Sequence, residues 1–139
     1  MKHIFIITTL CMAFIASSNA QDADQKLVEE TVSYYLDGGT NNDFETLKKA
    51  FHDDATMKFI GGDGYKAVNA LAFFKKGMKP GPKQKRTTSI EAVDVMGTAA
   101  TAKLKIKYDT FMFIDYMNLL KIDGQWKIVS KIFYRQNLN

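Results

Sequence analysis

The run from residue 100 to residue 120 constrains the fold most, because its two halves follow different apolar patterns. From Ala100 to Tyr108, apolar side chains alternate with threonine and lysine. This period of two predicts a β-strand with one face on the core and the other in solvent. From Thr110 to Leu120, both faces are largely apolar. This second segment therefore predicts a strand that is covered on both sides.

Covering both faces of that strand requires two different partners. One face of the Thr110–Leu120 strand can pack on helices of the same chain, but few residues remain to build a loop over the other. A second copy of the chain is the simplest cover for a large apolar surface, so we predict a homodimer through the sheet. One face carries Phe111, Phe113, Met117 and Leu119 and the other carries Met112, Ile114, Tyr116 and Leu120, and the sequence does not decide which of them meets the partner.

Helices precede most of the strands in the predicted order of elements. Apolar residues at helical spacing predict a first helix over Asp24–Asp37, ended by Gly38-Gly39. A sequence resembling a capping box at Asn42–Glu45 predicts a short second helix. The remaining elements are a strand over Thr56–Ile60, a third helix over Tyr65–Lys76, and strands over Thr87–Met96 and Gln125–Arg135. We therefore predict an α+β fold in which three N-terminal helices pack on a bent antiparallel sheet, with a cone-shaped apolar cavity between them.

The first twenty residues are typical of a secretory signal peptide. A basic start at Lys2 is followed by an apolar run over Ile4–Ile15 and by small residues at Ser18 and Ala20. The run is shorter than the roughly 20 residues needed to span a bilayer, so no stable membrane anchor is expected. We predict cleavage after Ala20, a single domain over residues 21–139, and export to the periplasm or the outside of the cell. Cleavage would also remove the only cysteine, Cys11.

Charge gives little indication of a partner. The formal net charge is +4, and basic residues cluster between Lys75 and Arg86 around glycines and prolines, which indicates a loop. Such a run is more often a solvated loop than a binding site for an anionic ligand or surface. Together with the predicted export, this argues against a nucleic-acid partner.

The segment from Phe113 to Lys131 carries a family resemblance; it reads FIDYMNLLKIDGQWKIVSK. It resembles the end of the nuclear transport factor 2-like superfamily, and most closely its putative lumazine-binding, SnoaL-like subgroup. Phe51–Ala55 and Ser89–Lys103 also resemble segments of that superfamily, so the likeness covers about Gln25–Tyr134. The resemblance implies a cone-shaped fold and a pterin-like ligand. The fold itself hosts isomerases, dehydratases, binding proteins and assembly domains.

Asp115 is the most interesting candidate for chemistry, because it is a carboxylate in the most apolar stretch of the chain. It could act as a general base, accept a hydrogen bond from a ligand, or pair with a residue of the adjacent strand. A two-residue turn at Asp123-Gly124 would place Asp115 opposite Ile132 and turn Lys131 to the other face. A three-residue turn would place Asp115 opposite Lys131 and allow an ion pair, so one residue of register decides between them.

Other candidate residues depend on weaker patterns. His52 with Asp53 could form a general base with an orienting carboxylate, although a surface turn explains the same residues more simply. A single histidine after cleavage does not make a metal site, and we predict no metal and no cofactor. Aromatic side chains with polar tips suit a flat heterocycle. The predicted ligand-binding set is Tyr35, Tyr65, Tyr108, Asp115, Tyr116, Trp126 and Lys131.

Three functions follow from these patterns. The preferred one is an exported small-molecule-binding protein, because the resemblance and the aromatic residues support a ligand while no nucleophile motif supports catalysis. The second is an acid-base enzyme, an isomerase or dehydratase, acting through Asp115 or His52 in the same cavity. The third is a dimeric interaction module whose cavity is filled by methionine and phenylalanine side chains.

Overall fold

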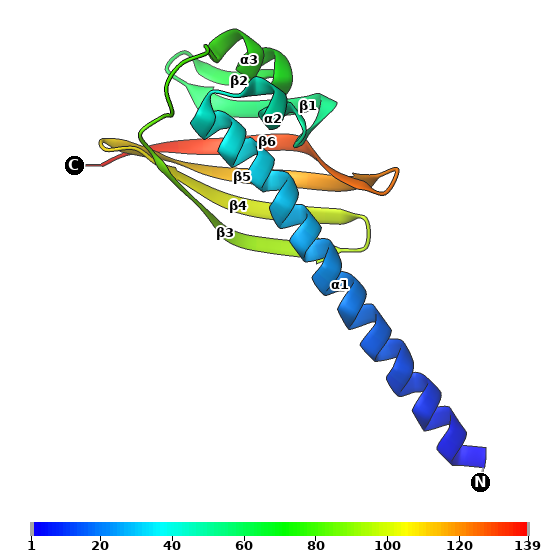
Figure 1. Cartoon of the computed structure of the whole chain (residues 1–139). Helices are drawn as coiled ribbons and strands as arrows, with labels where there is room; N and C mark the ends of the chain where they lie inside the picture. Colours follow the sequence, from blue (N-terminus) through cyan, green and yellow to red (C-terminus); the bar gives the residue numbers. More distant parts are fainter. Residues whose placement is uncertain (1, 139) are drawn as a thin grey trace.

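The computed structural model describes the backbone of residues 2–138 and the side chains of residues 20–138. In this part of the chain, three helices lie against one face of a six-stranded sheet (Figure 1). The elements are α1 (Lys2–Asn41), α2 (Phe44–Lys48), β1 (Phe51–Gly61), β2 (Gly64–Asn69), α3 (Ala70–Gly77), β3 (Thr87–Met96), β4 (Ala99–Lys107), β5 (Phe111–Ile122) and β6 (Gln125–Asn137). The predicted α+β class is confirmed.

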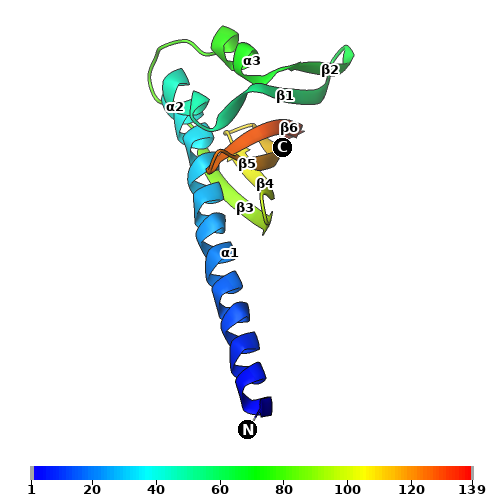
Figure 2. The same cartoon turned by 90° about the vertical axis from the view of Figure 1, so that its right-hand side faces the viewer.

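The sheet is mixed, which corrects the prediction of a purely antiparallel one. Its strand order is β2-β1-β6-β5-β4-β3, and β1 runs parallel to β6 while every other pair is antiparallel. The chain leaves α2 beside the start of β6, where the Ile128 N–H donates to the Ala50 carbonyl over 2.8 Å. From that point β1 proceeds in the direction of β6, a tertiary arrangement that no local pattern encodes. The sheet is strongly bent between β1 and β3 (Figure 2).

The predicted third helix begins too early, since the segment after Gly64 is a strand. Gly64 has φ +98 and closes a turn, and Tyr65 pairs with Ile60 of β1. The helix α3 starts only after Asn69, whose side chain accepts a hydrogen bond from the Ala72 N–H over 2.8 Å. This N-cap separates the strand from the helix.

The helix α1 also differs from the prediction, because it continues through Gly38-Gly39 to Asn41. Gly38 is needed for close packing: a Cβ there would lie 2.7 Å from the Leu47 Cα and would clash with the backbone of α2. The earlier part of α1 projects away from the sheet (Figures 1 and 2). The side chains of residues 1–19, and with them most of the predicted signal peptide, lie outside the described residues. Among the described residues, no helix is long and apolar enough to cross a membrane.

A β-bulge in β6 decides which side chains reach the interior. The turn at Asp123-Gly124 has two residues, both with positive φ, as the sequence indicates. However, Asn118 pairs with Ser130 while Leu119 pairs with Ile128, so Val129 is an extra residue on β6.

Beyond the bulge, the alternation of β6 is reversed relative to the sequence prediction. Lys131 and Phe133 turn inward, whereas Ile132 and Tyr134 turn outward. Asp115 is therefore opposite Phe133, and Lys131 is its diagonal neighbour on the same face. Neither of the two registers considered from the sequence is correct in detail, but the ion pair that one of them allowed is present.

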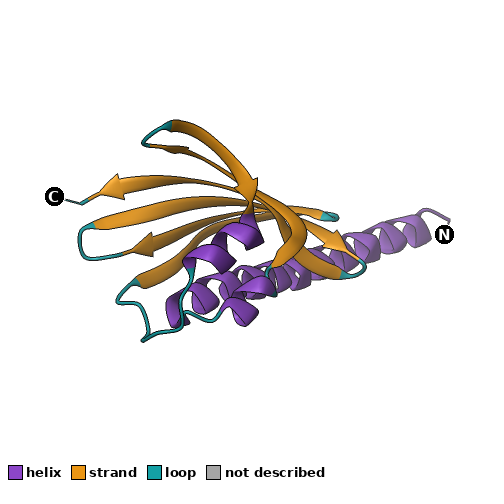
Figure 3. Ribbon diagram, turned by 90° about the horizontal axis from the view of Figure 1, so that it is seen from above, coloured by secondary structure: helices purple, strands orange, loops and turns teal. Residues whose placement is uncertain are grey.

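The core lies between the inner face of the sheet and the helices, which gather along one side of it (Figure 3). The alternation predicted for Ala100–Tyr108 is confirmed, because Ala102, Leu104 and Ile106 of β4 are buried. Val28 and Val32 of α1 complete this part of the core.

Candidate functional site

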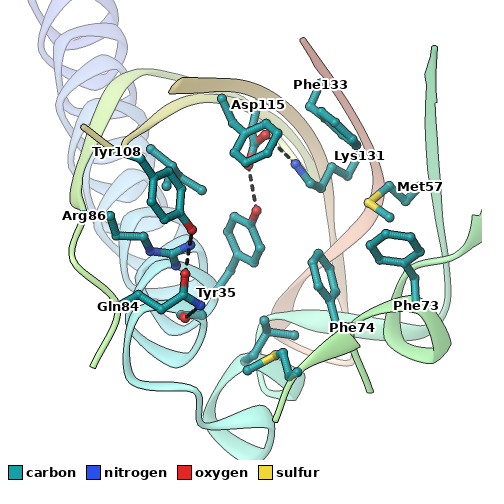
Figure 4. A pocket seen from close by; sticks show the side chains of 15 residues that line it. Tyr35, Met57, Phe73, Phe74, Gln84, Arg86, Tyr108, Asp115, Lys131 and Phe133 are labelled. Carbon is teal, nitrogen blue, oxygen red and sulfur yellow. Dashed lines mark hydrogen bonds and ion pairs between the residues drawn. The ribbon is translucent and has the colours of Figure 1, made fainter. Parts of the chain in front are cut away.

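A cavity of about 250 Å³ lies between the inner face of the sheet and the helices (Figure 4). Most of its wall is apolar or aromatic: Leu47, Met57, Phe73, Phe74, Met78, Ile106, Phe113 and Phe133. Its polar groups fall into two clusters, one around Asp115 and one around Arg86. An apolar pocket with a few convergent polar groups is the usual form of a small-molecule site.

The first cluster consists of Tyr35, Asp115 and Lys131. The Tyr35 hydroxyl donates to Asp115 Oδ2 over 2.7 Å, and Lys131 Nζ forms an ion pair with Oδ1. Asp115 is fully buried and Lys131 is 3% exposed. Each carboxylate oxygen of Asp115 therefore has a partner within the protein, the Tyr35 hydroxyl at Oδ2 and the Lys131 ammonium at Oδ1. The bulge in β6 brings this cluster together.

The surroundings of this cluster perturb two of its groups. Burial lowers the pKa of the Lys131 ammonium, while the Asp115 carboxylate opposes that shift. Burial, reinforced by the charge and hydrogen bond of Asp115, holds the pKa of Tyr35 well above its usual range. Lys131 Nζ also lies 4.5 Å from the ring centre of Phe133 and 5.5 Å from that of Tyr35. The ammonium is thus held by one carboxylate and two aromatic faces in place of water.

The second cluster is built around Arg86, whose guanidinium lies beside the C-terminal end of α1. Its guanidinium donates to the Leu36 carbonyl over 3.1 Å, to Thr40 Oγ1 over 2.9 Å and to the Tyr108 hydroxyl over 2.9 Å. Tyr108 in turn donates to Gln84 Oε1 over 2.7 Å. A cation is favoured at this position because the helix dipole places partial negative charge at a C-terminus. Among the described side chains, no carboxylate forms an ion pair with Arg86.

Four of the seven predicted ligand-binding residues line the cavity together: Tyr35, Tyr108, Asp115 and Lys131. The other three lie elsewhere. Tyr65 is 65% exposed on β2, and Tyr116 is exposed on the outer face of β5. Trp126 is buried, but its indole N–H donates to Asp24 Oδ1 of α1 over 3.1 Å, away from the cavity lining.

The predicted acid-base pair at His52 and Asp53 is not part of the cavity. Both residues belong to β1, next to its irregular pairing with β6, and they line a separate hollow with Lys48 and Lys127. The His52 ring contacts Asp54, and the Asp53 carbonyl accepts from Asn69. These contacts within β1 and with Asn69 explain the two residues as part of the local structure, without a catalytic role. Among the described residues, no group of three or more histidine, cysteine, aspartate or glutamate side chains is placed to hold a metal ion.

Sequence reasoning missed Arg86, Gln84 and most of the aromatic wall. It included Arg86 in the basic loop as a solvated charge, although the guanidinium turns inward. The one available signal was residue type, because Arg86 is the only arginine among the lysines of that loop. A guanidinium has five donors in a fixed fork and is better suited than an ammonium to bind several acceptors at once.

The outer face of the sheet carries a second feature of functional interest. Tyr116 and Leu120 of β5 and Ile132 and Tyr134 of β6 are exposed large apolar side chains. We call these four residues the outer apolar patch. The sequence placed Tyr116 and Leu120 together on one face of the strand without deciding which face is outward, and the bulge adds Ile132 and Tyr134 to it.

Comparisons with known proteins agree with this architecture. Residues 23–134 match a protein family described as putative lumazine-binding. A protein named aldolase FrzH, from Cladobotryum sp., is 27% identical over 131 residues, which span 88% of this chain and 97% of that protein.

Solved structures show the same fold. NTF2-like proteins from Shewanella baltica OS155 and Methylobacillus flagellatus KT are both 28% identical to this chain, with TM-scores of 0.74 and 0.72. Each alignment covers 82% of this chain, and they cover 94% and 93% of those two proteins. A ketosteroid isomerase-like protein from Erwinia carotovora atroseptica has a TM-score of 0.63 at 12% identity, covering 81% of this chain and 95% of that one. This last similarity concerns the fold alone.

Proposed function

The chain belongs to the putative lumazine-binding family of nuclear transport factor 2-like proteins, and we propose that it is an exported protein that binds a small heterocyclic or apolar molecule in its cavity. The observation that carries the proposal is the cavity itself, whose aromatic wall surrounds a buried cluster of Tyr35, Asp115 and Lys131. Aromatic faces suit a flat ring, and the polar cluster can fix its orientation.

The size of the cavity limits the ligand. At about 250 Å³ it is slightly smaller than the roughly 300–1,000 Å³ of typical drug-sized sites, so a molecule of one or two rings fits best. Methionine and phenylalanine side chains line this space without filling it, which argues against a pure interaction module. The Tyr35–Asp115–Lys131 cluster and the Arg86–Tyr108 pair both line this space, so polar groups at two places can orient a ring.

Native mass spectrometry of the purified protein, with an absorbance spectrum of the same sample, tests this proposal. We expect extra mass and near-ultraviolet absorption from a bound heterocycle. Two neighbouring tyrosines of α1 give a matched pair of variants. Tyr35→Phe removes a hydroxyl from the cavity, whereas Tyr34→Phe removes one that bonds Glu30 at the surface. Ligand retention should fall only in Tyr35→Phe. Equal retention in both variants, or no bound ligand under any condition, would count against the cavity as a binding site.

A second candidate function is acid-base catalysis on a carbonyl compound. The relative named aldolase FrzH supports it, as does the presence of a carboxylate, a phenol and an amine in one apolar site. Asp115 would be the base, as in the isomerase or dehydratase role inferred from the sequence. Asp115→Asn should abolish any turnover while the protein stays folded. Retained turnover would remove Asp115 from that role.

Export and dimerisation complete the proposal. The order of basic, apolar and small residues before Gln21 supports a cleaved signal peptide. N-terminal sequencing of the protein recovered from its native compartment should begin at Gln21. The outer apolar patch supports a homodimer, because Tyr116 and Ile132 are cross-strand partners and an exposed apolar patch often marks an interface.

A further inference from the structure

Building on the proposed ligand cavity, we propose that Lys131 is a reactive amine that condenses reversibly with the carbonyl carbon of a small aldehyde or ketone bound there, forming an imine. This assigns a covalent role to a residue that would otherwise serve only as the counter-ion of Asp115. It also narrows the ligand class from any flat molecule to one that carries a carbonyl group.

The position of the amine supports this role. Lys131 lies on β6, a strand paired on both edges, and its Nζ reaches the cavity wall with 4% of the side chain exposed. Its immediate neighbours are the Asp115 carboxylate and the rings of Tyr35 and Phe133. A lysine in such a site is held in one orientation and shielded from bulk water, which would otherwise hydrolyse an imine.

The same surroundings make the amine nucleophilic. Only the neutral amine attacks a carbonyl, and burial disfavours the ammonium form, which lowers the pKa of Lys131. Asp115 opposes that shift but is also in direct contact with Nζ, so it can accept the proton when the amine reacts. Tyr35 donates to the other carboxylate oxygen and keeps Asp115 oriented. Buried lysines are used as Schiff-base residues for this reason.

The condensation balances with the groups present. The ammonium of Lys131 transfers one proton to the Asp115 carboxylate, and the neutral nitrogen attacks the carbonyl carbon, forming the C–N bond as the C=O π bond breaks. The carbonyl oxygen takes up a proton from Asp115 to give a carbinolamine. A second proton passes from nitrogen through Asp115 to the hydroxyl, water leaves, and the C=N bond forms. No oxidant, reductant or metal is required.

Reductive trapping of the full-length protein tests the proposal. Benzaldehyde, a one-ring aldehyde that suits the aromatic wall, is added with sodium cyanoborohydride, and the site of benzylation is located by peptide mass mapping. We expect Lys131 to be modified roughly tenfold faster than Lys107, an exposed lysine of β4 in the same molecule. Because both rates are measured within wild-type protein, the comparison does not depend on a variant. Lys131→Arg keeps a cation beside Asp115 and should lose the fast adduct.

Benzyl alcohol separates failure of the imine from failure of the cavity. It has the same ring but no carbonyl, and its binding is followed through the methyl resonances of Met57, which lines the cavity, and of exposed Met96 as the control. Shifts at Met57 alone together with a fast adduct at Lys131 support the proposal. Shifts at Met57 with Lys131 no faster than Lys107 would overturn it and leave the binding function standing. No shift and no fast adduct would overturn both.

Discussion

Replacing Asp115 by leucine should destabilise the protein more than any other single change in the cavity. Asp115 is fully buried and is the only described carboxylate that pairs with Lys131, itself 3% exposed. Removing one partner of a buried ion pair leaves an uncompensated charge, which typically costs about 3–5 kcal/mol. Loss of the acceptor for the Tyr35 hydroxyl adds to that cost. We therefore expect Asp115→Leu to lose at least about 3 kcal/mol of unfolding free energy.

Removing the whole cluster should restore all of this loss. The triple variant Asp115→Leu, Lys131→Met, Tyr35→Phe replaces every charged and hydroxyl group of the cluster by apolar groups. Apolar replacement of a complete buried ion pair is often neutral or stabilising by about 1–4 kcal/mol, because neither desolvation penalty remains. The triple variant should therefore equal or exceed wild type in stability, despite carrying the most damaging single substitution.

Urea denaturation provides the measurement, with Trp126 as the probe. It is the only tryptophan, it is buried, and it contacts Asp24 of α1, so its fluorescence reports the packing of helix on sheet. Glu91→Leu is the control, since Glu91 pairs with Lys105 on the surface and should hardly move the midpoint. If the urea midpoint of Asp115→Leu moved as little as that of Glu91→Leu, the reasoning would be refuted, because Lys131 would then carry no uncompensated charge in that variant. If the triple variant were as unstable as Asp115→Leu, lost packing would be the cause of the instability.

Three further predictions test other parts of the structure. Gly38→Ala should be strongly destabilising because its Cβ clashes with α2, whereas Gly62→Ala, with open space around it, should leave the thermal midpoint nearly unchanged. The hydrogen bond from Lys121, and then that from Trp126, lowers the pKa of Asp24 in the folded protein below its ordinary value of 3.8. The stability that Asp24 contributes is therefore complete above the ordinary pKa and is lost as the pH falls through the lowered pKa of the folded state. Asp24→Asn should remove this acid dependence from melting curves recorded at a series of pH values. Ile132→Glu in the outer apolar patch should convert the proposed dimer to a monomer in sedimentation velocity without lowering ligand binding, and a wild-type monomer would refute the interface.

The sequence predicted the elements whose signals are local. The alternation over Ala100–Tyr108 and the turn at Asp123-Gly124 each depend on neighbouring residues, and both are present in the structure. The bulge at Val129 has no comparable signal, because valine is an ordinary strand residue. That single extra residue reverses the faces of Lys131 and Ile132, which explains why the inner side chains before the bulge, Trp126 and Ile128, were predicted correctly and those after it were not.

The errors at β2 and at Arg86 arise from tertiary contacts. The segment after Gly64 has enough apolar residues for either a helix or a short strand, and pairing with β1 decides in favour of the strand. Arg86 lies in a run of lysines that is solvated by default, and only the nearby end of α1 gives it acceptors. Tertiary contacts also separate two tyrosines that the sequence treated alike: Tyr35 is buried in the cavity wall, whereas Tyr65 is exposed on β2.

The cavity and the Asp115–Lys131 pair together argue that this site exists for a ligand. An unfilled cavity forfeits the dispersion contacts that its wall would otherwise make. A buried ion pair is seldom more stabilising than apolar residues of the same volume. A chain selected only for stability would gain by filling the space with larger apolar side chains and removing the charges. Both costs fall in one place here, at the buried Asp115–Lys131 pair in the wall of the cavity. Sequences depart from the most stable arrangement mainly at functional sites, so the coincidence of these departures at Asp115 supports the proposed ligand site.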